Sequence, residues 1–224
     1  MSRAHLRASL ALWRRRLLFR QRRLKVSVRH HRTASARKWR RLVDEAHQKV
    51  SRRERQLAAA RPLRVKAWHI AGQLVGDTES AGHNRGPAVD KVIRYAQGDL
   101  GEAYCVDGVI YSYGKAGSKI VKPGFPRAVR MMLVTGVRKI LAPRVGDIVR
   151  FTFDHTGLFG GWYRQRPDGS YVRSPRLLAT HLRTREFNTS ALGALSSDAN
   201  DGTDGIYEKY RAKSLVSDFL RVHE

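Results

Sequence analysis

Residues 101–115, GEAYCVDGVIYSYGK, predict a helix that begins at the single cysteine of the chain, Cys105. The helix is indicated by apolar side chains at helical spacing, Val109, Ile110 and Tyr113. Backbone N–H groups and the helix dipole stabilise a thiolate at a helix N-terminus. The sequence therefore places the cysteine where its reactive form is favoured.

Before this segment, residues 84–87, NRGP, predict a loop entering another helix, which Gly98 ends. Glycines, short β-branched runs and turn signals follow Pro62 and continue towards the end of the chain. This texture is typical of a compact α+β domain, which we assign to residues 67–224.

Two predicted strands carry the polar residues that a reactive thiol needs as partners. Residues 145–153, VGDIVRFTF, are rich in β-forming residues, and His155 follows after Asp154, which predicts a strand with a histidine at its end. Residues 184–190, TREFNTS, predict a strand in which alternation puts Glu186 and Asn188 on one face. The chain thus presents, in order, a thiol, an imidazole, and a carboxylate or amide that could orient the imidazole. This is the layout of a cysteine hydrolase.

Each of these residues also has a structural interpretation. A single cysteine is often a small buried apolar residue, a histidine after a strand is often part of a turn, and a glutamate on an edge strand is usually solvated. The catalytic interpretation rests on the order and setting of the three residues together.

Several segments of the larger domain, taken together, carry a family likeness. They are Gly-x-x-Tyr-Cys at 101–105, Gly-Asp-Ile-Val at 146–149, Asp-His-Thr-Gly at 154–157, Glu-x-Asn-Thr-Ser at 186–190 and the terminal run DGIYEKYRAKSLVSDFLRV at 204–222. The combination resembles the CHAP family of cysteine, histidine-dependent amidohydrolases/peptidases. These are papain-like domains common in bacteriophage lysins and in bacterial wall-remodelling enzymes.

The resemblance implies an antiparallel sheet packed on helices and a peptidoglycan hydrolase that cleaves an amide bond. The enzyme would be an endopeptidase or an N-acetylmuramoyl-L-alanine amidase. By the same resemblance Cys105 corresponds to the nucleophile, His155 to the base, and Glu186 and Asn188 to the residues that orient and polarise the base. No cofactor and no metal ion are expected. The alternative is a basic structural virion protein that binds nucleic acid or membrane and has an inactive hydrolase-like domain.

Two features depart from the family pattern. Asp107 lies two residues after the cysteine, where a carboxylate would either raise the pKa of the thiol or serve the first turn of the helix. Residues 160–183, GGWYRQRPDGSYVRSPRLLATHLR, form an insert with a Pro-Asp-Gly turn, which predicts an extended hairpin. The hairpin would shape the substrate cleft or decorate the edge of the sheet.

Positive charge is concentrated in the first part of the chain. The whole chain has 44 basic and 19 acidic residues, and residues 1–66 hold 22 of the basic but only 3 of the acidic ones. This excess predicts a polyanionic partner. Neither Gly nor Pro occurs from Met1 to Arg61, which favours helix.

Two heptad seams run through this basic region, on either side of a polar break at 27–36, SVRHHRTASA. The first has Leu6, Leu10, Trp13, Leu17 and Leu24, with Arg20 in the gap, and the second has Trp39, Val43, Ala46, Val50, Leu57 and Ala60, with Arg53 in the gap. They predict two amphipathic helices that pack as a hairpin or pair with another copy as a homo-oligomer. The region is either a solvated spacer or an arm for an anionic surface, membrane or wall polymer. Specific recognition of nucleic acid is not expected, because the arginines surround both helices.

Other classes of protein are excluded or set aside. No run approaches the roughly 18 apolar residues of a membrane-spanning helix, and Arg14 to Arg16 interrupt the apolar start. We therefore expect a protein made in the host cytoplasm without a signal peptide, which acts at the cell wall as a lysis enzyme or as a part of the virion. Residues 196–205, SSDANDGTDG, lack EF-hand spacing and predict a turn rather than a calcium site.

Overall fold

The computed structural model describes residues 3–29, 33–80, 83–190 and 204–223. The chain divides into two compact units, Met1–Arg61 and Pro62–Glu224. The sequence prediction placed this boundary between residues 66 and 67, but a helix, α3 (Leu63–Gly72), runs across that point. Among the described residues, no helix is both long enough and apolar enough to cross a bilayer.

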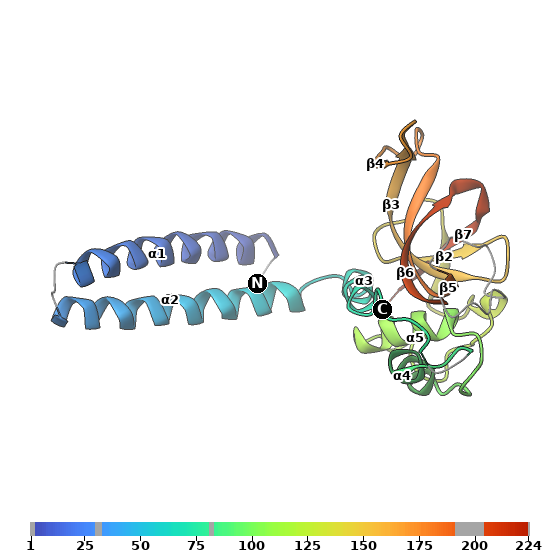
Figure 1. Cartoon of the computed structure of the whole chain (residues 1–224), viewed down its shortest axis with the longest axis horizontal. Helices are drawn as coiled ribbons and strands as arrows, with labels where there is room; N and C mark the ends of the chain where they lie inside the picture. Colours follow the sequence, from blue (N-terminus) through green and yellow to red (C-terminus); the bar gives the residue numbers. More distant parts are fainter. Residues whose placement is uncertain (1–2, 30–32, 81–82, 191–203, 224) are drawn as a thin grey trace. The chain divides into compact units, whose positions relative to one another are not determined.

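The first unit is a pair of antiparallel helices, α1 (Arg3–Arg29) and α2 (Thr33–Ala59) (Figure 1). The predicted polar break at 27–36 is mostly helical, because residues 27–29 belong to α1 and residues 33–36 to α2. Both predicted seams contribute buried side chains to the contact between the helices. The buried residues are Leu6 and Leu10 of α1 and Val43, Ala46 and Val50 of α2. Burial of a large apolar side chain contributes about 1.5–3 kcal/mol, so this shared face holds the two helices together. Of the two predicted arrangements, the structure has the hairpin.

An arginine in each seam is accommodated by hydrogen bonds. Arg20 of α1 donates from Nη1 to the carbonyl oxygen of Leu42 at 2.7 Å, and the same nitrogen lies 3.5 Å from the Glu45 carboxylate. Arg53 of α2 donates from Nη1 to Gln56 Oε1 at 2.7 Å. The aliphatic stem of an arginine can cover apolar surface while its head group finds polar partners, so these interruptions do not break the packing.

The second unit is α+β, as the sequence predicts. Three helices, α3, α4 (Pro87–Ala96) and α5 (Cys105–Lys115), precede the sheet. The described strands, all paired antiparallel, are β1 (Val137–Ile140), β2 (Ile148–Phe151), β3 (Thr156–Gln165), β4 (Tyr171–Arg173), β5 (His181–Ser190), β6 (Asp204–Ala212) and β7 (Val216–Val222). Their order is β1-β7-β2-β3-β5-β6, with β4 paired to β3. Figure 1 shows α4 and α5 gathered on one side of the sheet.

Helix α5 lies at the centre of the core. Its predicted stripe, Val109, Ile110 and Tyr113, is completely buried and belongs to a cluster that includes apolar side chains of α4 and of the sheet. The helix approaches the sheet closely at Gly108, where a Cβ atom would lie 1.9 Å from Cγ of Phe187. This contact brings the first turn of α5 close to β5.

The segment before β3 differs from the prediction in detail. The predicted strand at 145–153 is shorter, and β2 ends at Phe151. The chain then turns back, with the N–H of Phe151 donating to the carbonyl oxygen of His155 at 3.1 Å. His155 therefore precedes β3 instead of extending β2. The insert at 160–183 contains the predicted hairpin, formed by β3 and β4.

Candidate active site

Three of the residues predicted to be catalytic meet in the second unit. Cys105 is the first residue of α5, His155 immediately precedes β3, and Glu186 lies within β5. Nε2 of His155 donates to Oε2 of Glu186 at 3.1 Å, and the imidazole also forms a side-chain hydrogen bond with Cys105. All three side chains are buried. With Nε2 occupied by the carboxylate, Nδ1 is the ring nitrogen left for the thiol.

The pairing of β3 with β5 explains why histidine and glutamate meet. Gly157, two residues after His155, stands opposite Glu186 in the register of these strands. A Cβ atom at Gly157 would lie 2.9 Å from Cγ of Glu186 and 2.7 Å from the carbonyl oxygen of Arg185. The glycine of the Asp-His-Thr-Gly turn thus leaves room for the glutamate side chain beside the histidine.

The electrostatics of the pair favour the charged form of both groups. Burial alone would lower the pKa of His155, but hydrogen bonds to Cys105 and Glu186 and their negative charges outweigh burial and raise it from 6.5 to about 9. Burial would raise the pKa of Glu186, but hydrogen bonds from His155 and Arg211 and their positive charges lower it from 4.5 to about 2. At neutral pH the site therefore holds an imidazolium paired with a carboxylate.

Arg211 of β6 is a member of the site that sequence reasoning missed. Its Nε lies 3.0 Å from both carboxylate oxygens of Glu186, and its Nη2 donates to Oε2 at 2.6 Å. The hydroxyl of Thr184 donates to the other oxygen, Oε1. The carboxylate is therefore fixed from several sides and presents a set direction to His155. A single arginine inside a predicted strand gives no signal for this role, because only the pairing of β5 with β6 brings it to Glu186.

Asn188 does not take the place that alternation predicts. It has a φ of 57° and lies at an irregularity in β5, between Phe187 and Thr189. As a result Thr189, not Asn188, shares Arg211 with Glu186, through a hydrogen bond of 2.9 Å from Nη2 to Oγ1. The prediction that regular alternation puts Asn188 on the face of Glu186 is wrong.

The side chain of Asn188 is buried all the same. Its backbone is hydrogen-bonded to the side chain of Tyr104, the residue that precedes the cysteine. Within the described part of the chain, its Oδ1 has no hydrogen-bond partner, and no hydrogen bond joins Asn188 to His155. The structure therefore brings the glutamate to the imidazole and not the asparagine.

The segment that precedes the cysteine, residues 101–104, is held by a cluster of polar side chains. Tyr104 donates from its hydroxyl to Oε1 of Glu79 at 3.2 Å, and burial, reinforced by that carboxylate, raises the pKa of the tyrosine. The backbone N–H of Asn84 donates to Oε2 of Glu79 at 2.7 Å, and its side-chain amide donates to the carbonyl oxygen of Gly101 at 3.0 Å. The Asn-Arg-Gly-Pro loop is thereby tied to the segment that positions Cys105.

Asp107, in the first turn of α5, forms an ion pair with Arg127. Arg127 donates to both of its carboxylate oxygens, at 2.8 and 2.9 Å, and also to Glu102 at 2.7 Å. Burial raises the pKa of Asp107, although Arg127 opposes the shift. Asp107 lies in the first turn of the helix, and Arg127 compensates its charge there.

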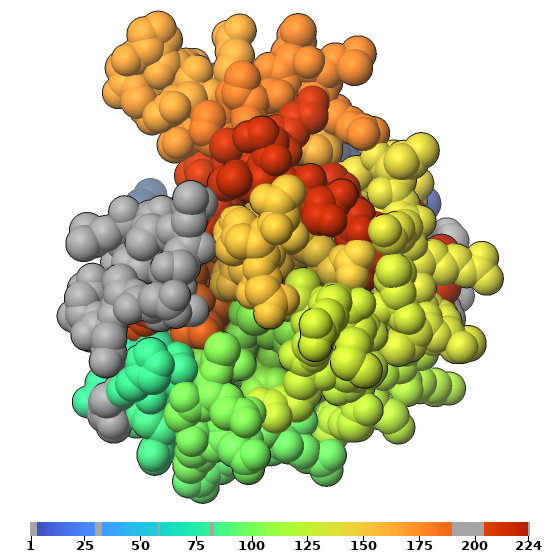
Figure 2. All heavy atoms as spheres, turned by 90° about the vertical axis from the view of Figure 1, so that its right-hand side faces the viewer, coloured from blue at the N-terminus to red at the C-terminus, as the bar shows by residue number. Residues whose placement is uncertain are grey.

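Two aromatic rings border the imidazole, and a hollow lies beside them. The ring of His155 lies next to those of Phe151 and Phe153, at a centroid distance of 5.7 Å from each, and the two phenylalanine rings stack on each other at 5.2 Å. The same phenylalanines, with Asp154 and the exposed Arg130, line a hollow of about 310 Å³. Figure 2 shows the gold segment around residue 155 at the centre of one face, above the green segment that follows residue 100. The hollow adjoins the two phenylalanines that contact His155, and its lining does not include His155, Cys105 or Glu186.

The predicted turn at 196–205 lies mostly outside the described residues. Of its acidic residues only Asp204 is described, and it is buried at the start of β6. Within the described ranges, no group of three or more His, Cys, Asp or Glu side chains is placed to hold a metal ion. Comparisons of the chain with protein-family models, curated proteins and solved structures found no match, so the function is argued from the site itself.

Proposed function

We propose that this protein is a peptidoglycan hydrolase that cleaves an amide bond through a cysteine nucleophile. The observation that carries the proposal is the buried line of Cys105, His155, Glu186 and Arg211, which begins at a helix N-terminus. The motif resemblance supports the same conclusion, and it adds a papain-like CHAP fold and a bacterial cell-wall substrate.

The proposed reaction begins with the thiolate of Cys105 and the imidazolium of His155. The sulfur attacks the amide carbon, and the carbonyl oxygen becomes an oxyanion. No side chain caps the N-terminus of α5 among the described residues, so the N–H of Cys105 is the donor we assign to the oxyanion. The imidazolium then gives its proton to the amine as the C–N bond breaks, which leaves a thioester.

Water completes the cycle. His155, now neutral, takes a proton from a water molecule, whose oxygen attacks the thioester carbon. The C–S bond breaks, the carboxylic acid leaves, and the proton held on the imidazole restores the starting ion pair. Glu186 keeps the ring oriented and supports its positive charge in the protonated states, and Arg211 keeps the glutamate ionised.

The substrate proposal rests on the resemblance and on the chemistry of the hollow. Peptidoglycan contains amide bonds in its stem peptides and between muramic acid and alanine, and its stems carry carboxylates. The exposed guanidinium of Arg130 beside the hollow suits such a carboxylate. The protein would act at the wall, as a lysis enzyme or within the virion, and its presence in purified particles would separate these two settings.

The competing proposal is a structural virion protein with an inactive hydrolase-like domain. The hydrogen bonds that join the thiol, the imidazole and the carboxylate weigh against it, because an inactive domain has no need to keep them together. The basic hairpin is compatible with both proposals.

The test is amine release from purified peptidoglycan by the full-length chain and by Cys105→Ser, which preserves the size of the side chain. New amino groups without new reducing ends, absent in Cys105→Ser, are the expected result. Mass spectrometry of the fragments then identifies the bond. Ser112→Ala in the same helix is the control and should retain activity. No amine release from several wall types by the folded wild-type chain would overturn the proposal.

A further inference from the structure

Helix α1 carries a second set of apolar side chains, outside its buried seam. Leu12, Phe19 and Val26 are 48, 54 and 51 % exposed, respectively. They are spaced seven residues apart and therefore form one line along the helix, which we name the outer stripe. The seam residues of α1 lie elsewhere on its circumference and face α2. Phe19 also contacts Trp39 of α2, with ring centroids 6.2 Å apart, but more than half of its surface stays exposed, so pairing with α2 leaves the outer stripe largely uncovered.

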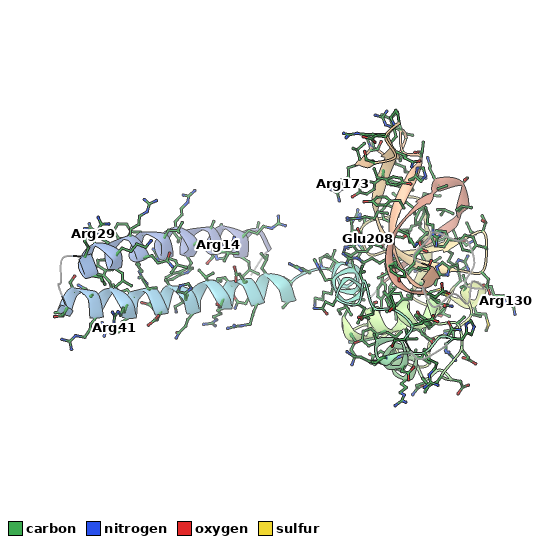
Figure 3. The ribbon with its side chains drawn as sticks, in the orientation of Figure 1. Arg14, Arg29, Arg41, Arg130, Arg173 and Glu208 are labelled. Atoms are coloured by element: carbon green, nitrogen blue, oxygen red, sulfur yellow. The ribbon has the colours of Figure 1, made fainter. Side chains whose placement is uncertain are left out.

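Exposed arginines border the outer stripe on both sides. At 100° per residue, Arg15 and Arg22 lie on one side of the line and Arg16 and Arg23 on the other. The guanidinium of Arg23 stands 5.5 Å from the centroid of the Phe19 ring. From Arg3 to Arg29 the helix has ten basic residues and no acidic one. Figure 3 shows nitrogen-tipped side chains projecting from the helix along its length.

The partner helix differs from α1 in both respects. All three acidic residues of the first unit, Asp44, Glu45 and Glu54, lie on α2. None of the large apolar side chains described on α2 is exposed. Two of these acidic residues pair with arginines of α1, Glu54 with Arg14 and Glu45 with Arg20. Both helices keep an excess of positive charge, but only on α1 does it occur together with exposed large apolar side chains among the described residues.

The combination selects one kind of partner. A second copy would bring together two surfaces of the same sign, each from a unit with twenty basic and three acidic residues. A soluble polyanion would satisfy the arginines but would leave the apolar side chains in water. A bilayer that contains anionic lipids offers phosphates to the arginines and an acyl region to the outer stripe.

We propose that α1 binds the surface of an anionic lipid bilayer through the outer stripe, lying parallel to the membrane plane. The stripe extends over about 21 Å, from Leu12 to Val26, at 1.5 Å per residue. The flanking arginines reach the headgroup phosphates on both sides of it, and α2 lies on the watery side. This proposal is independent of the hydrolase activity.

The test uses the full-length chain and sedimentation with vesicles, either of phosphatidylcholine alone or with an added fraction of phosphatidylglycerol. The stripe variant is Leu12→Ser with Val26→Ser, which keeps the contact between Phe19 and Trp39. Two matched charge variants each replace four exposed arginines with glutamine, and these are Arg15, Arg16, Arg22 and Arg23 on α1, and Arg37, Arg41, Arg52 and Arg55 on α2. Helix content by circular dichroism checks that the hairpin remains folded.

We expect the wild-type chain to bind the anionic vesicles and to bind the neutral ones weakly. The stripe variant should lose about tenfold or more in affinity without a change in helix content. The charge variant of α1 should lose more affinity than that of α2, and added salt should weaken binding only in part.

Four results would overturn the proposal. They are no binding to anionic vesicles, unchanged binding by the folded stripe variant, equal losses in the two charge variants, and displacement from vesicles by polyphosphate at equal phosphate concentration. A stripe variant that turns a dimeric protein into a monomer would assign the stripe to a second copy instead.

Discussion

His155 and Glu186 are joined by a hydrogen bond of 3.1 Å, and the carboxylate at its end is held in turn by Arg211. The imidazolium of His155, the carboxylate of Glu186 and the guanidinium of Arg211 thus alternate in charge along a buried line that begins at Cys105. Each charge is compensated by its neighbour, so the line is stable as a whole and sensitive to the loss of any one member. This gives Arg211 a positioning role, although it need not touch the substrate.

Arg211→Met should weaken catalysis through Glu186. Without the guanidinium the pKa of Glu186 should rise and that of His155 should fall, because the carboxylate is less well held in its charged form. We expect kcat for peptidoglycan cleavage to fall by about 10²-fold and the alkaline limit of the pH–rate profile to move to lower pH. Arg211→Lys keeps the positive charge, so its kcat and its alkaline limit should lie between those of Arg211→Met and the wild type.

Arg183→Met is the matched control for this prediction. It removes an arginine from the neighbouring strand β5 that pairs with Glu208, at 3.3 Å, instead of with Glu186. The control should lower thermal stability without moving the pH profile. An Arg211→Met profile that keeps its alkaline limit would assign that arginine to stability alone.

The stability of the domain should depend on pH through the same pair. The pKa of His155 is raised from 6.5 to about 9, so its contribution is fully present below pH 6.5 and is lost as the pH rises through 9. The pKa of Glu186 is lowered from 4.5 to about 2, so its contribution is present above pH 4.5 and is lost as the pH falls through 2. Thermal unfolding should therefore show a plateau between about pH 4.5 and 6.5.

His155→Asn should flatten the alkaline side of that stability profile. The histidine contributes about 3 kcal/mol from a shift of this size, so the difference in melting temperature between wild type and variant should shrink between pH 6.5 and 9. A constant difference over this range would show that the imidazole is not preferentially protonated in the folded state.

The parts of the site that could be predicted from the sequence are those set by local pattern. Cys105 begins a helix because apolar residues recur at helical spacing after it, and His155 lies at a turn between β-forming runs. Glu186 was expected beside His155, together with Asn188, because alternation puts both on one face of their strand and the family resemblance gives them the role of orienting the base. These expectations need no knowledge of which strands pair.

Arg211 and Asn188 show where local pattern stops being informative. The arginine reaches the site only through the register of β5 with β6, a pairing across residues 191–203 that no periodicity reveals. The asparagine was misplaced because alternation assumes a regular strand, whereas its φ of 57° interrupts β5. The boundary between the units was placed a few residues late for a similar reason, because charge composition does not mark where α3 begins.

Asn188→Gly should show that the asparagine, unlike Glu186, does not set the protonation of His155. Glycine adopts the positive φ without strain, so the variant removes the side chain and preserves the backbone. Because no described hydrogen bond joins Asn188 to His155, the alkaline limit of the pH–rate profile should stay in place, whereas Glu186→Gln should move it down. Equal shifts in both variants would return Asn188 to a direct role on the imidazole.

Gly108→Ala should show how the fold positions the nucleophile. Its new Cβ would meet the ring of Phe187 at 1.9 Å, and this ring is fully buried, so α5 must move away from β5. Overpacking of this kind costs about 1–3 kcal/mol, and the shift should also separate Cys105 from His155.

Gly114→Ala in the same helix is the control, because its Cβ meets the hydroxyl end of Tyr95, a partly exposed side chain that can turn aside. We expect Gly108→Ala to lose both melting temperature and peptidoglycan cleavage, and Gly114→Ala to keep most of both. Loss of stability in Gly108→Ala with full activity in the folded fraction would mean that the position of α5 against β5 does not set the geometry of the thiol.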